Sequence, residues 1–568
     1  MRRDSCMRLL PFVAALIVAV TTLGIGWGST TLRRDRTPIR PQVPGASRMV
    51  ADKVFLERAD ELRKGRSDDY QVVVGNVLFR RAGMYMYCDS ALFFESDSLE
   101  AFGNIRMEQG DTLFVYADQL VYGGNTRLAT LYADAGKLVK LINRDVTLTT
   151  EIFNYDMGIE LGYYEVGGTL WDKQNRLTSW YGEYSPSTKE AVFQDEVHLH
   201  SLRPNDTLDI YTQEMVYSTM THIATLDTTS TIISGDGTIY TSYGTYNTDQ
   251  QQADLYSRSL VKAKNGNTLT GDTLFYDRER GFGRAIGNIE LRDSANRAIL
   301  TGDEGFYYEL RDSARVWGRA LARQYPENEE SEDTLYLHAD TIRTYQIITP
   351  ARYENDSLLA AADSTHYMVA SPHVRFYRVD LQGLCDSMTL VQRDSMMYLD
   401  KHPVVWSDNR QIFGNEIQVH LQDSTADWAR LPRFGFMAEN IEDEFYNQLT
   451  GKEMYATFAD RSIRTLDVSG NVQAIYLPME NDSTYNKIAN VESSFLSAEF
   501  ADQQIQRMKM WNETNGTMTP LYLAKKNLYY LPRFRWFEPL RPKDPEDVFN
   551  ISREMLDLMA EPEFDSRP

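Results

Sequence analysis

An internal repeat constrains the fold of this chain more than any other feature. The segment LTGDTLFYDRERGFGRAIGNIELR, which starts at Leu269, returns from Leu300 as LTGDEGFYYELRDSARVWGRALAR, with ten identities in 24 ungapped positions. A match this dense predicts one supersecondary unit that is used more than once. Such a unit cannot bury its apolar face alone, so successive units are expected to stack into one extended core.

Each half of the repeat also occurs separately along the chain. The first half returns as GDTLFVYAD from Gly110, DTLDIY from Asp206 and DTLYLHAD from Asp333. The second half appears as GNVLF from Gly75, GNIRM from Gly103, GNIEL from Gly287 and GNVQA from Gly470. Apolar and polar residues alternate within these pieces, and Gly-Asn and Gly-Asp pairs suit turns that need positive φ. The pattern is typical of many short strands joined by tight turns.

The predicted fold class is therefore all-β, an elongated solenoid-like stack of repeated strand pairs, for which the family resemblance described below implies a twisted β-jellyroll. Within GNIEL, Ile289 and Leu291 fall on one strand face, while the polar residues between them face the other way. The pairs Val77 with Phe79 and Ile105 with Met107 repeat this spacing. We expect an apolar inside and a polar outside.

The N-terminus has the composition of an export signal. Arg2, Arg3 and Arg8 precede an apolar run over residues 9–27, as in secretory leaders. The run is also long enough for a helix that spans a bilayer. Residues 1–28 are thus predicted to be either a cleaved signal peptide or a hydrophobic helix anchored in the inner membrane, and both place the rest of the chain in the periplasm.

The remaining boundaries follow changes in composition. Residues 29–69 are basic and Pro-rich at their start and are predicted to be a linker, with a short helix over 52–64. The repeats are clear over 70–350 and degenerate over 351–505. Residues 506–568 are predicted to form a less regular C-terminal cap or docking tail that ends in a short amphipathic helix.

Composition and motifs argue against several functions. The formal net charge of -22 disfavours nucleic-acid binding. The sequence has no G-x-S-x-G, H-E-x-x-H or P-loop motif, and GFGRAIG from Gly281 does not have the dinucleotide-binding spacing. We therefore predict a protein that is not an enzyme and needs no cofactor. A β-helical carbohydrate-active enzyme with stacked carboxylates stays open as an alternative.

Isolated histidines and cysteines predict no metal site and no disulfide. His198 and His200 share a strand face, but no third ligand is evident nearby, so both are expected to be ordinary surface residues. Cys88 and Cys385 are expected to be separate, buried, free thiols. Asp-Ser or Asp-Thr pairs recur along the chain. They are interpreted as turn residues, with O-glycosylation as the alternative.

The export signal, followed by repeated G-D-T-L-x-x-x-A-D and A-x-G-N-[IV]-x-[LM] strands, resembles the OstA-type organic-solvent-tolerance family, which includes LptA-like and LptD N-terminal-like domains. The resemblance covers residues 70–345 and, more weakly, 355–505. It implies a periplasmic protein of lipopolysaccharide transport and outer-membrane assembly, whose β-jellyroll groove shields acyl chains. The implied partners are lipopolysaccharide or lipid A, and transport proteins of the same fold that join by edge-strand pairing.

Carried onto this sequence, the resemblance implies eight residues that line the lipid groove. They are Val77, Phe79, Ile105, Met107, Phe275, Ile289, Leu291 and Phe306. The alternative is ordinary core packing, in an envelope structural or adhesive β-solenoid that holds no lipid.

Overall fold

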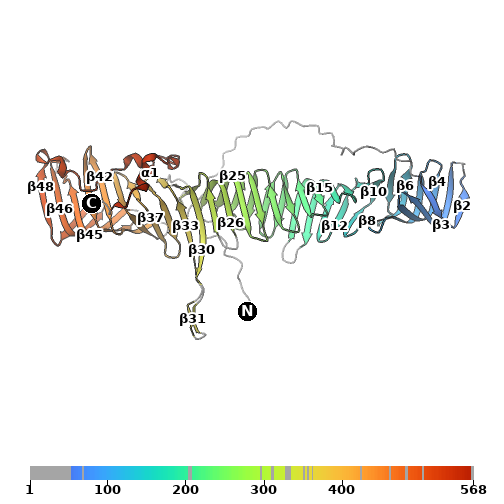
Figure 1. The fold of residues 1–568 in the computed structure, drawn as a ribbon, viewed down its shortest axis with the longest axis horizontal. Coiled ribbons are helices and arrows are strands. Elements are labelled where there is room, and N and C mark those ends of the chain that lie inside the picture. Colours follow the sequence, from blue (N-terminus) through green and yellow to red (C-terminus); the bar gives the residue numbers. More distant parts are fainter. Residues whose placement is uncertain are drawn as a thin grey trace. The chain divides into compact units, whose positions relative to one another are not determined.

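The computed structural model describes residues 53–564. Gaps fall at 67–68, 203–206, 295–296, 309–312, 327–333, 350–351, 355–356, 361–362, 423–424, 460–461, 480–483 and 502–503. The predicted leader over 1–28, and the predicted linker as far as Asp52, lie outside the described residues. The all-β prediction is confirmed, because the chain forms antiparallel strands nearly throughout (Figure 1).

The chain divides into two compact units. The N-terminal unit runs from the first described residue to Lys264 and includes Thr273–Glu279. The C-terminal unit comprises Asn265–Asp272 and the chain from Arg280 to the last described residue.

Long strands that bend in the middle organise the N-terminal unit. They are β3 (Tyr70–Arg81), β4 (Met84–Phe94), β5 (Leu99–Gln109), β6 (Leu113–Gly123), β15 (Glu190–Leu202) and β16 (Thr207–Ser218). Where a long strand borders short strands, its two halves pair with different ones. Residues 119–123 of β6 pair with β7, for example, while residues 113–116 pair with β8. The short strands therefore form two separate layers.

Layer one of this unit holds β7 (Leu128–Tyr132), β10 (Ile152–Asp156), β11 (Leu161–Tyr164), β14 (Tyr181–Ser185), β17 (Ile223–Leu226), β20 (Gly244–Asn247), β21 (Gln252–Leu255) and β24 (Thr273–Asp277). Layer two holds β8 (Val139–Asn143), β9 (Val146–Thr150), β12 (Gly168–Asp172), β13 (Asn175–Ser179), β18 (Ser230–Ser234), β19 (Gly237–Thr241) and β22 (Ser259–Ala263).

The C-terminal unit repeats this plan. Its long strands are β25 (Phe282–Asp293), which pairs with β23 (Thr268–Gly271), then β26 (Ala298–Tyr308), β45 (Ser462–Tyr476) and β46 (Lys487–Ala501). Layer one holds β27 (Ser313–Trp317), β30 (Thr341–Thr349), β33 (Asp363–Ser371), β36 (Ser387–Val391), β37 (Met396–Asp400), β40 (Glu416–Gln422), β41 (Thr425–Leu431) and β44 (Glu453–Ala459).

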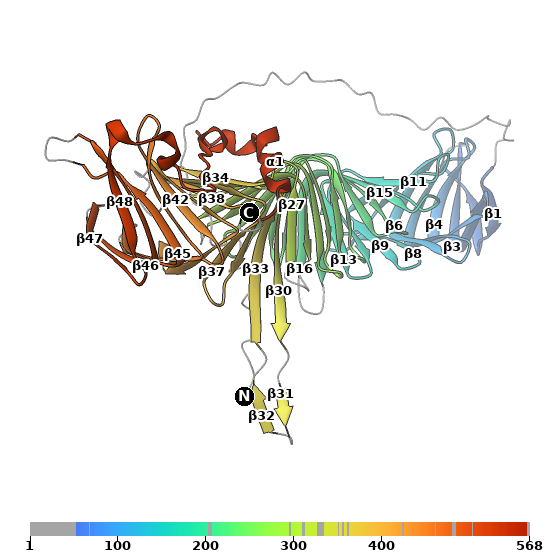
Figure 2. The same cartoon turned by 60° about the vertical axis from the view of Figure 1, so that its left-hand side comes forward.

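Layer two of the C-terminal unit holds β28 (Leu321–Gln324), β29 (Leu335–His338), β34 (Val374–Arg378), β35 (Leu381–Cys385), β38 (Val404–Ser407), β39 (Arg410–Gly414), β42 (Gly435–Glu442) and β43 (Phe445–Gly451). A separate hairpin, β31 (Arg352–Glu354) with β32 (Ser357–Ala360), extends beyond the ends of β30 and β33 in Figure 2. The unit's last strands, β47 (Gln504–Trp511) and β48 (Asn515–Pro520), both pair with β46.

The Gly-Asn pairs mark the points where long strands pass from one layer to the other. Gly103 and Asn104 both have positive φ, as the sequence predicted, but they lie inside β5 and not in a hairpin turn. Opposite them, Asp89 of β4 accepts a 2.7 Å hydrogen bond from the Asn104 side-chain amide. The same bond joins Asn76 to Asp60 and Asn288 to Asp272. We call this arrangement the strand corner.

Between the layers of the N-terminal unit, most of the interior is filled. Layer two contributes a ladder of aliphatic side chains in direct register, Leu141, Leu148, Leu170, Leu177, Leu199, Ile210 and Ile232. Layer one contributes the buried rings of Phe153, Tyr155, Tyr164 and Tyr184. Tyrosine hydroxyls bond across to layer two, as in the 2.7 Å bond between Tyr164 and Ser179. This stretch is therefore a packed core rather than an open groove.

The start and end of the described chain differ from prediction. The helix expected over 52–64 is wrong, because β1 (Phe55–Arg58) and β2 (Glu61–Lys64) are strands that pair with β3. The C-terminal helix is confirmed as α1 (Arg553–Ala560), which begins with a Ser552 side-chain cap at the Met555 N–H. The segment 506–520 contributes β48 and most of β47, so the irregular part begins only at residue 521.

Residues 521–564, here called the C-terminal strap, do not cover the end of the stack. The strap contains η3 (Leu521–Leu523), η4 (Lys526–Leu528), η5 (Glu538–Leu540), η6 (Asp547–Phe549) and α1. It lies along the outer face of layer two in its own unit, where it appears in red near β34 and β38 (Figure 2). There Phe537 and Leu558 join Trp406 and Phe413 in a second apolar core. The predicted cap is thus a lateral cover.

Candidate lipid-binding cleft

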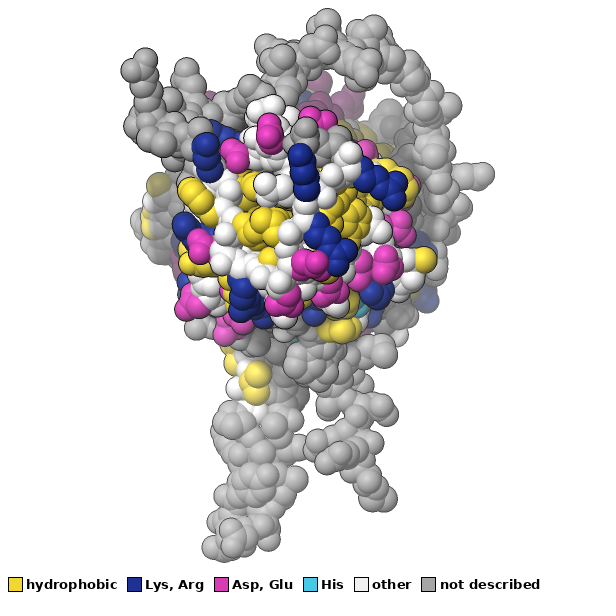
Figure 3. Space-filling model, turned by 90° about the vertical axis from the view of Figure 1, so that its right-hand side faces the viewer, with side chains coloured by type: hydrophobic (Ala, Val, Ile, Leu, Met, Phe, Trp, Pro, Cys, Tyr) yellow, Lys and Arg dark blue, Asp and Glu magenta, His cyan; other side chains and the backbone are white. Residues whose placement is uncertain are grey.

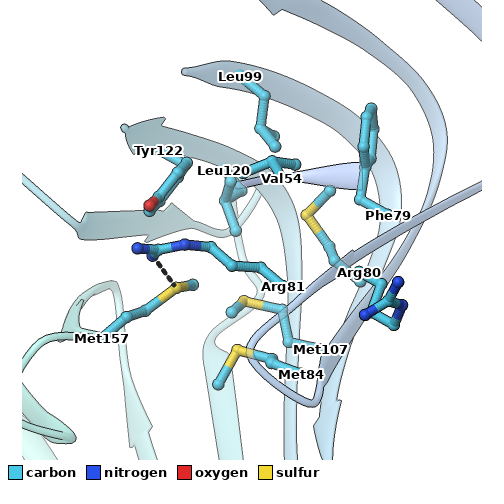
Figure 4. Close-up of a pocket in the computed structure, with 11 residues that line it drawn as sticks. Val54, Phe79, Arg80, Arg81, Met84, Leu99, Met107, Leu120, Tyr122 and Met157 are labelled. Carbon is cyan, nitrogen blue, oxygen red and sulfur yellow. Dashed lines mark hydrogen bonds between the residues drawn. The ribbon is translucent and has the colours of Figure 1, made fainter. Parts of the chain in front are cut away.

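One end of the N-terminal unit's interior is not filled by the ladder of aliphatic and aromatic side chains. A cleft opens there among the inner faces of β3, β4, β5 and β6 (Figure 4). Its lining consists of Val54, Phe79, Arg80, Arg81, Met84, Met86, Leu99, Met107, Leu120, Tyr122 and Met157. Figure 3 looks onto this end of the unit, where apolar side chains gather in the middle and charged side chains surround them.

Methionines give the cleft its character. Met84 and Met86 project from β4 and Met107 from the adjacent β5, and Met157 adds a fourth thioether from the turn after β10. Methionine side chains are unbranched and change rotamer easily, so such a wall adapts to irregular apolar ligands. The empty space is about 350 Å³ including the open mouth. Water-sized molecules fit only its widest part, so a ligand must displace the methionine side chains.

A guanidinium and a buried hydroxyl add polar chemistry to the cleft. The Arg81 guanidinium lies over the Tyr122 ring, 5.2 Å from its centroid, and its Nη1 is 3.4 Å from Sδ of Met157. The Tyr122 hydroxyl is buried and has no hydrogen-bond partner among the described residues. Burial raises the pKa of Tyr122, so the hydroxyl stays protonated and can donate. A donor left unpaired in an apolar site is available to a ligand.

The neighbouring Arg80 points away from this polar pair. Its Nε is 2.7 Å from a carboxylate oxygen of Glu57, and its guanidinium lies over the Phe55 ring. Arg81 is therefore the cation that extends across the cleft, as Figure 4 shows. An apolar interior next to one guanidinium suits an anionic amphiphile.

Six of the eight predicted groove residues face the interior of their unit. Phe79 and Met107 line the cleft, and Val77 and Ile105 are buried on the same inner faces of β3 and β5. In the C-terminal unit, Ile289 is buried, and Leu291 packs against the core. Contact of any of these residues with lipid remains a prediction.

The prediction of an inward-facing side chain is wrong for Phe275 and Phe306. On β24 the inward residue is Leu274, which is buried opposite Leu255, so Phe275 faces outward beside Asp254. Phe306 also faces outward, where its ring lies 5.0 Å from that of Trp317. The strand corner adds one residue to the alternation. The set of residues that faces inward, as judged from the sequence, therefore shifts by one residue after Asp272 and after Asp303.

Several lining residues were missed by sequence reasoning. Met84 and Met86 alternate in MYMYC as regularly as the chosen residues do, and Leu120 and Tyr122 alternate in QLVY. Period-two alternation alone would have found these four. Met157 comes from a turn, and no sequence pattern places it at the cleft.

Family comparisons agree with this part of the fold. Residues 51–209 match the model of the OstA-like protein family, and residues 161–262 match the LptC-related family of lipopolysaccharide assembly. Over these residues, the predicted resemblance to the OstA-type lipopolysaccharide-transport family is confirmed. All residues that line the cleft fall inside the OstA-like match. No curated protein matches this sequence.

The OstA-type assignment supports a role in lipopolysaccharide transport. Both matched families are transport components that act in the periplasm, and neither is an enzyme family. Within the described residues, no helix has the length and apolar character needed to cross a membrane.

Proposed function

We propose that this OstA-type chain binds lipopolysaccharide in the periplasm and shields its acyl chains in the methionine-lined cleft. The observation that carries the proposal is the cleft itself. It is an apolar opening, crossed by Arg81, at one end of a unit whose interior is packed from Leu141 to Ile232. Each buried CH₂ of an acyl chain contributes about 0.8 kcal/mol. Transport of this kind requires burial and release and no bond-breaking step.

Arg81 and Tyr122 would hold the polar part of the lipid. A guanidinium pairs with phosphate oxygens through charge-assisted hydrogen bonds, which are stronger than neutral ones. The unpaired Tyr122 hydroxyl lies beside the same guanidinium and supplies one further donor. The headgroup is thus expected beside this pair, and the acyl chains against Met107 and Leu120.

Strand edges offer a route for passing the lipid to partners. Among the described strands, β1 and β2 pair only with β3, and they are largely exposed. An open edge of this kind accepts a strand from another protein. We propose that transport proteins with the same β fold dock there. This edge is close to the cleft, because Val54, which precedes β1, is one of the residues that line it.

Purified full-length protein can be tested by displacement of a fluorescent hydrophobic probe with lipid A. We expect saturable displacement, weakened by Met84→Trp, which fills the cleft, and by Arg81→Gln, which removes the charge. Met220→Trp is the matched control, because Met220 is 70% exposed outside the cleft. Equal lipid affinity in the folded Met84→Trp and wild-type proteins would contradict the cleft. Absence of any saturable binding would contradict the function.

The packed stretch from Leu141 to Ile232 favours one alternative. A structural or adhesive β-solenoid also needs a filled interior, and this stretch has no open groove. Such a protein would show no lipid A binding, so the same titration separates the two functions.

A further inference from the structure

Three potential metal ligands meet on the outer face of layer two in the N-terminal unit. His198 and His200 project from β15, and Asp209 projects from the adjacent β16. His198 Nε2 and His200 Nδ1 each lie 2.7 Å from the same oxygen, Oδ1 of Asp209. The three ligand atoms are all within 4.8 Å of one another.

Strand register creates this cluster. His200 pairs directly with Asp209, and His198 pairs with Tyr211 one step along the same face. The Tyr211 ring stacks on the His198 imidazole, with centroids 4.4 Å apart and planes 10° from parallel. Because the ladder is unbroken from the pair Val197–Thr212 to the pair Leu202–Thr207, the backbone holds the three side chains at fixed positions. A preset arrangement lowers the entropy cost of closing around an ion.

We propose that His198, His200 and Asp209 form a binding site for a divalent transition metal of the zinc class. Two imidazoles and one carboxylate are a ligand set that zinc accepts, with bonds of about 2.0–2.2 Å. A tetrahedral ion with such bonds needs its ligands roughly 3.3 Å apart. The observed atoms are close enough to reach that spacing through small side-chain rotations. The metal replaces the protons that now link both imidazoles to Asp209.

The surroundings suggest what completes the site. Arg176 and Thr178 of β13 line the same shallow depression as the three ligands. Three protein ligands leave one position of a tetrahedral ion open to water or an anion. The guanidinium of Arg176, which lies 5.4 Å from the Trp171 ring centroid, favours an anion at that position. The site faces outward from the packed core, so its occupation is independent of lipid in the cleft.

The C-terminal unit supplies a matched comparison. His420 Nδ1 lies 3.0 Å from Asp427, and the His420 ring stacks on Trp428 at 9°. Here too a histidine contacts an aspartate carboxylate and stacks on an aromatic ring, but there is only one histidine. It should bind the ion far more weakly than the three-residue cluster.

Calorimetric titration of chelator-treated full-length protein with zinc chloride tests the proposal. We expect one tight site per chain, weakened about tenfold or more in His200→Gln and in Asp209→Asn, and unchanged in His420→Gln. Cobalt chloride should give the visible absorption of a tetrahedral ion with nitrogen and oxygen ligands in the wild type, which tests the site without any substitution.

Two outcomes would overturn the proposal. One is absence of tight zinc binding to the wild type. The other is undiminished binding to a folded Asp209→Asn protein, with folding checked by its circular dichroism. Lipid A displacement is measured in parallel. Its result bears on the cleft alone, so failure of either proposal is recognised separately.

Discussion

The backbone N–H of Phe537 donates a 2.7 Å hydrogen bond to Oε1 of Gln411. The same side chain donates from Nε2 to the carbonyl of Arg535 at 2.9 Å, so one amide satisfies the strap backbone on two sides. Gln448 does the same for Tyr529 and Leu531. The strap is therefore held by side-chain amides of layer two, in place of a strand ladder.

Replacing Gln411 with Met should loosen the strap. Gln411 is fully buried, and its loss leaves the Phe537 N–H and the Arg535 carbonyl without partners, at a cost of about 1–3 kcal/mol. Hydrogen exchange should accelerate over residues 529–540 and stay unchanged in the N-terminal unit. Gln422→Met, at an exposed position, is the control. Unchanged exchange over the strap would show that apolar packing alone holds it.

The strand corner predicts a difference between two glycines. Gly103 and Gly83 have nearly equal φ values of +77° and +79°, but an added Cβ meets the Asp89 carboxylate only at Gly103. Gly83→Ala should reduce the free energy of unfolding by about 1 kcal/mol through backbone strain. Gly103→Ala should reduce the free energy of unfolding by about 1–3 kcal/mol more, because the added Cβ clashes with Asp89. Denaturant titration measures both, and equal losses would mean that Asp89 moves aside.

The buried hydroxyl of Tyr217 should contribute to stability. It donates to Asp172 at 2.8 Å and accepts from Asn175 at 2.9 Å, and all three residues are buried. Tyr217→Phe leaves both partners with one bond fewer and should cost about 1–3 kcal/mol. Tyr155→Phe is the control, because no hydrogen bond of its hydroxyl is found among the described residues. Similar losses in both variants would assign the effect to packing.

Stability should fall at acidic pH because of His338. Burial lowers the pKa of His338 below its ordinary 6.5, and this outweighs the 2.8 Å hydrogen bond from its Nδ1 to the Ala320 carbonyl. The unfolded chain then binds a proton near pH 6.5 that the folded chain does not, so stability decreases as pH falls from 6.5 towards the lower folded pKa. Denaturation at pH 7.5 and 5.5 should show a smaller decrease for His338→Gln. An equal decrease would exclude His338 as the cause.

Both described cysteines should resist thiol reagents. Burial raises the pKa of Cys88 to about 12 and that of Cys385 well above its ordinary value. Because the thiolate is the reactive form, labelling at pH 8 should be slower by about a thousandfold in folded protein than in denaturant. A Cys6→Ser background removes the third thiol, and Cys88→Ser assigns the remaining signal. Rapid labelling of the folded protein would mean that the core opens locally.

Local alternation was enough to predict much of the fold. The inward direction predicted for Val77 and Phe79 is correct, because both lie on one side of a corner, where inward and outward residues alternate without interruption. The free, buried state of Cys88 and Cys385 is also confirmed. Positive φ at Gly103 and Asn104 was predictable from residue type, but a hairpin turn and a corner need the same conformation. Only the partner Asp89 on the neighbouring strand distinguishes them.

What remained hidden depends on strand register and on long-range packing. Asp209 meets His200 because the consecutive strands β15 and β16 pair in a register that places the two residues opposite each other, and residue alternation alone does not fix that register. The strap was mistaken for a cap, although a sign of it is present. In β38 and β39 both faces are apolar or buried, with Trp406 and Phe413 on the face opposite Val405 and Ile412. A strand that is apolar on both sides needs a cover on each.

The strand corner also bears on how a chain of this kind changes its length. Each Asn finds its Asp 15 or 16 residues away, on the neighbouring strand or in the break between two short strands. None of these three corners depends on a distant repeat, so duplication or loss of a whole repeat leaves the others satisfied. Adding or removing two strands changes the length of a layer by roughly 10 Å. Reach across a compartment can therefore evolve stepwise, by recombination within one gene, without redesign of the core.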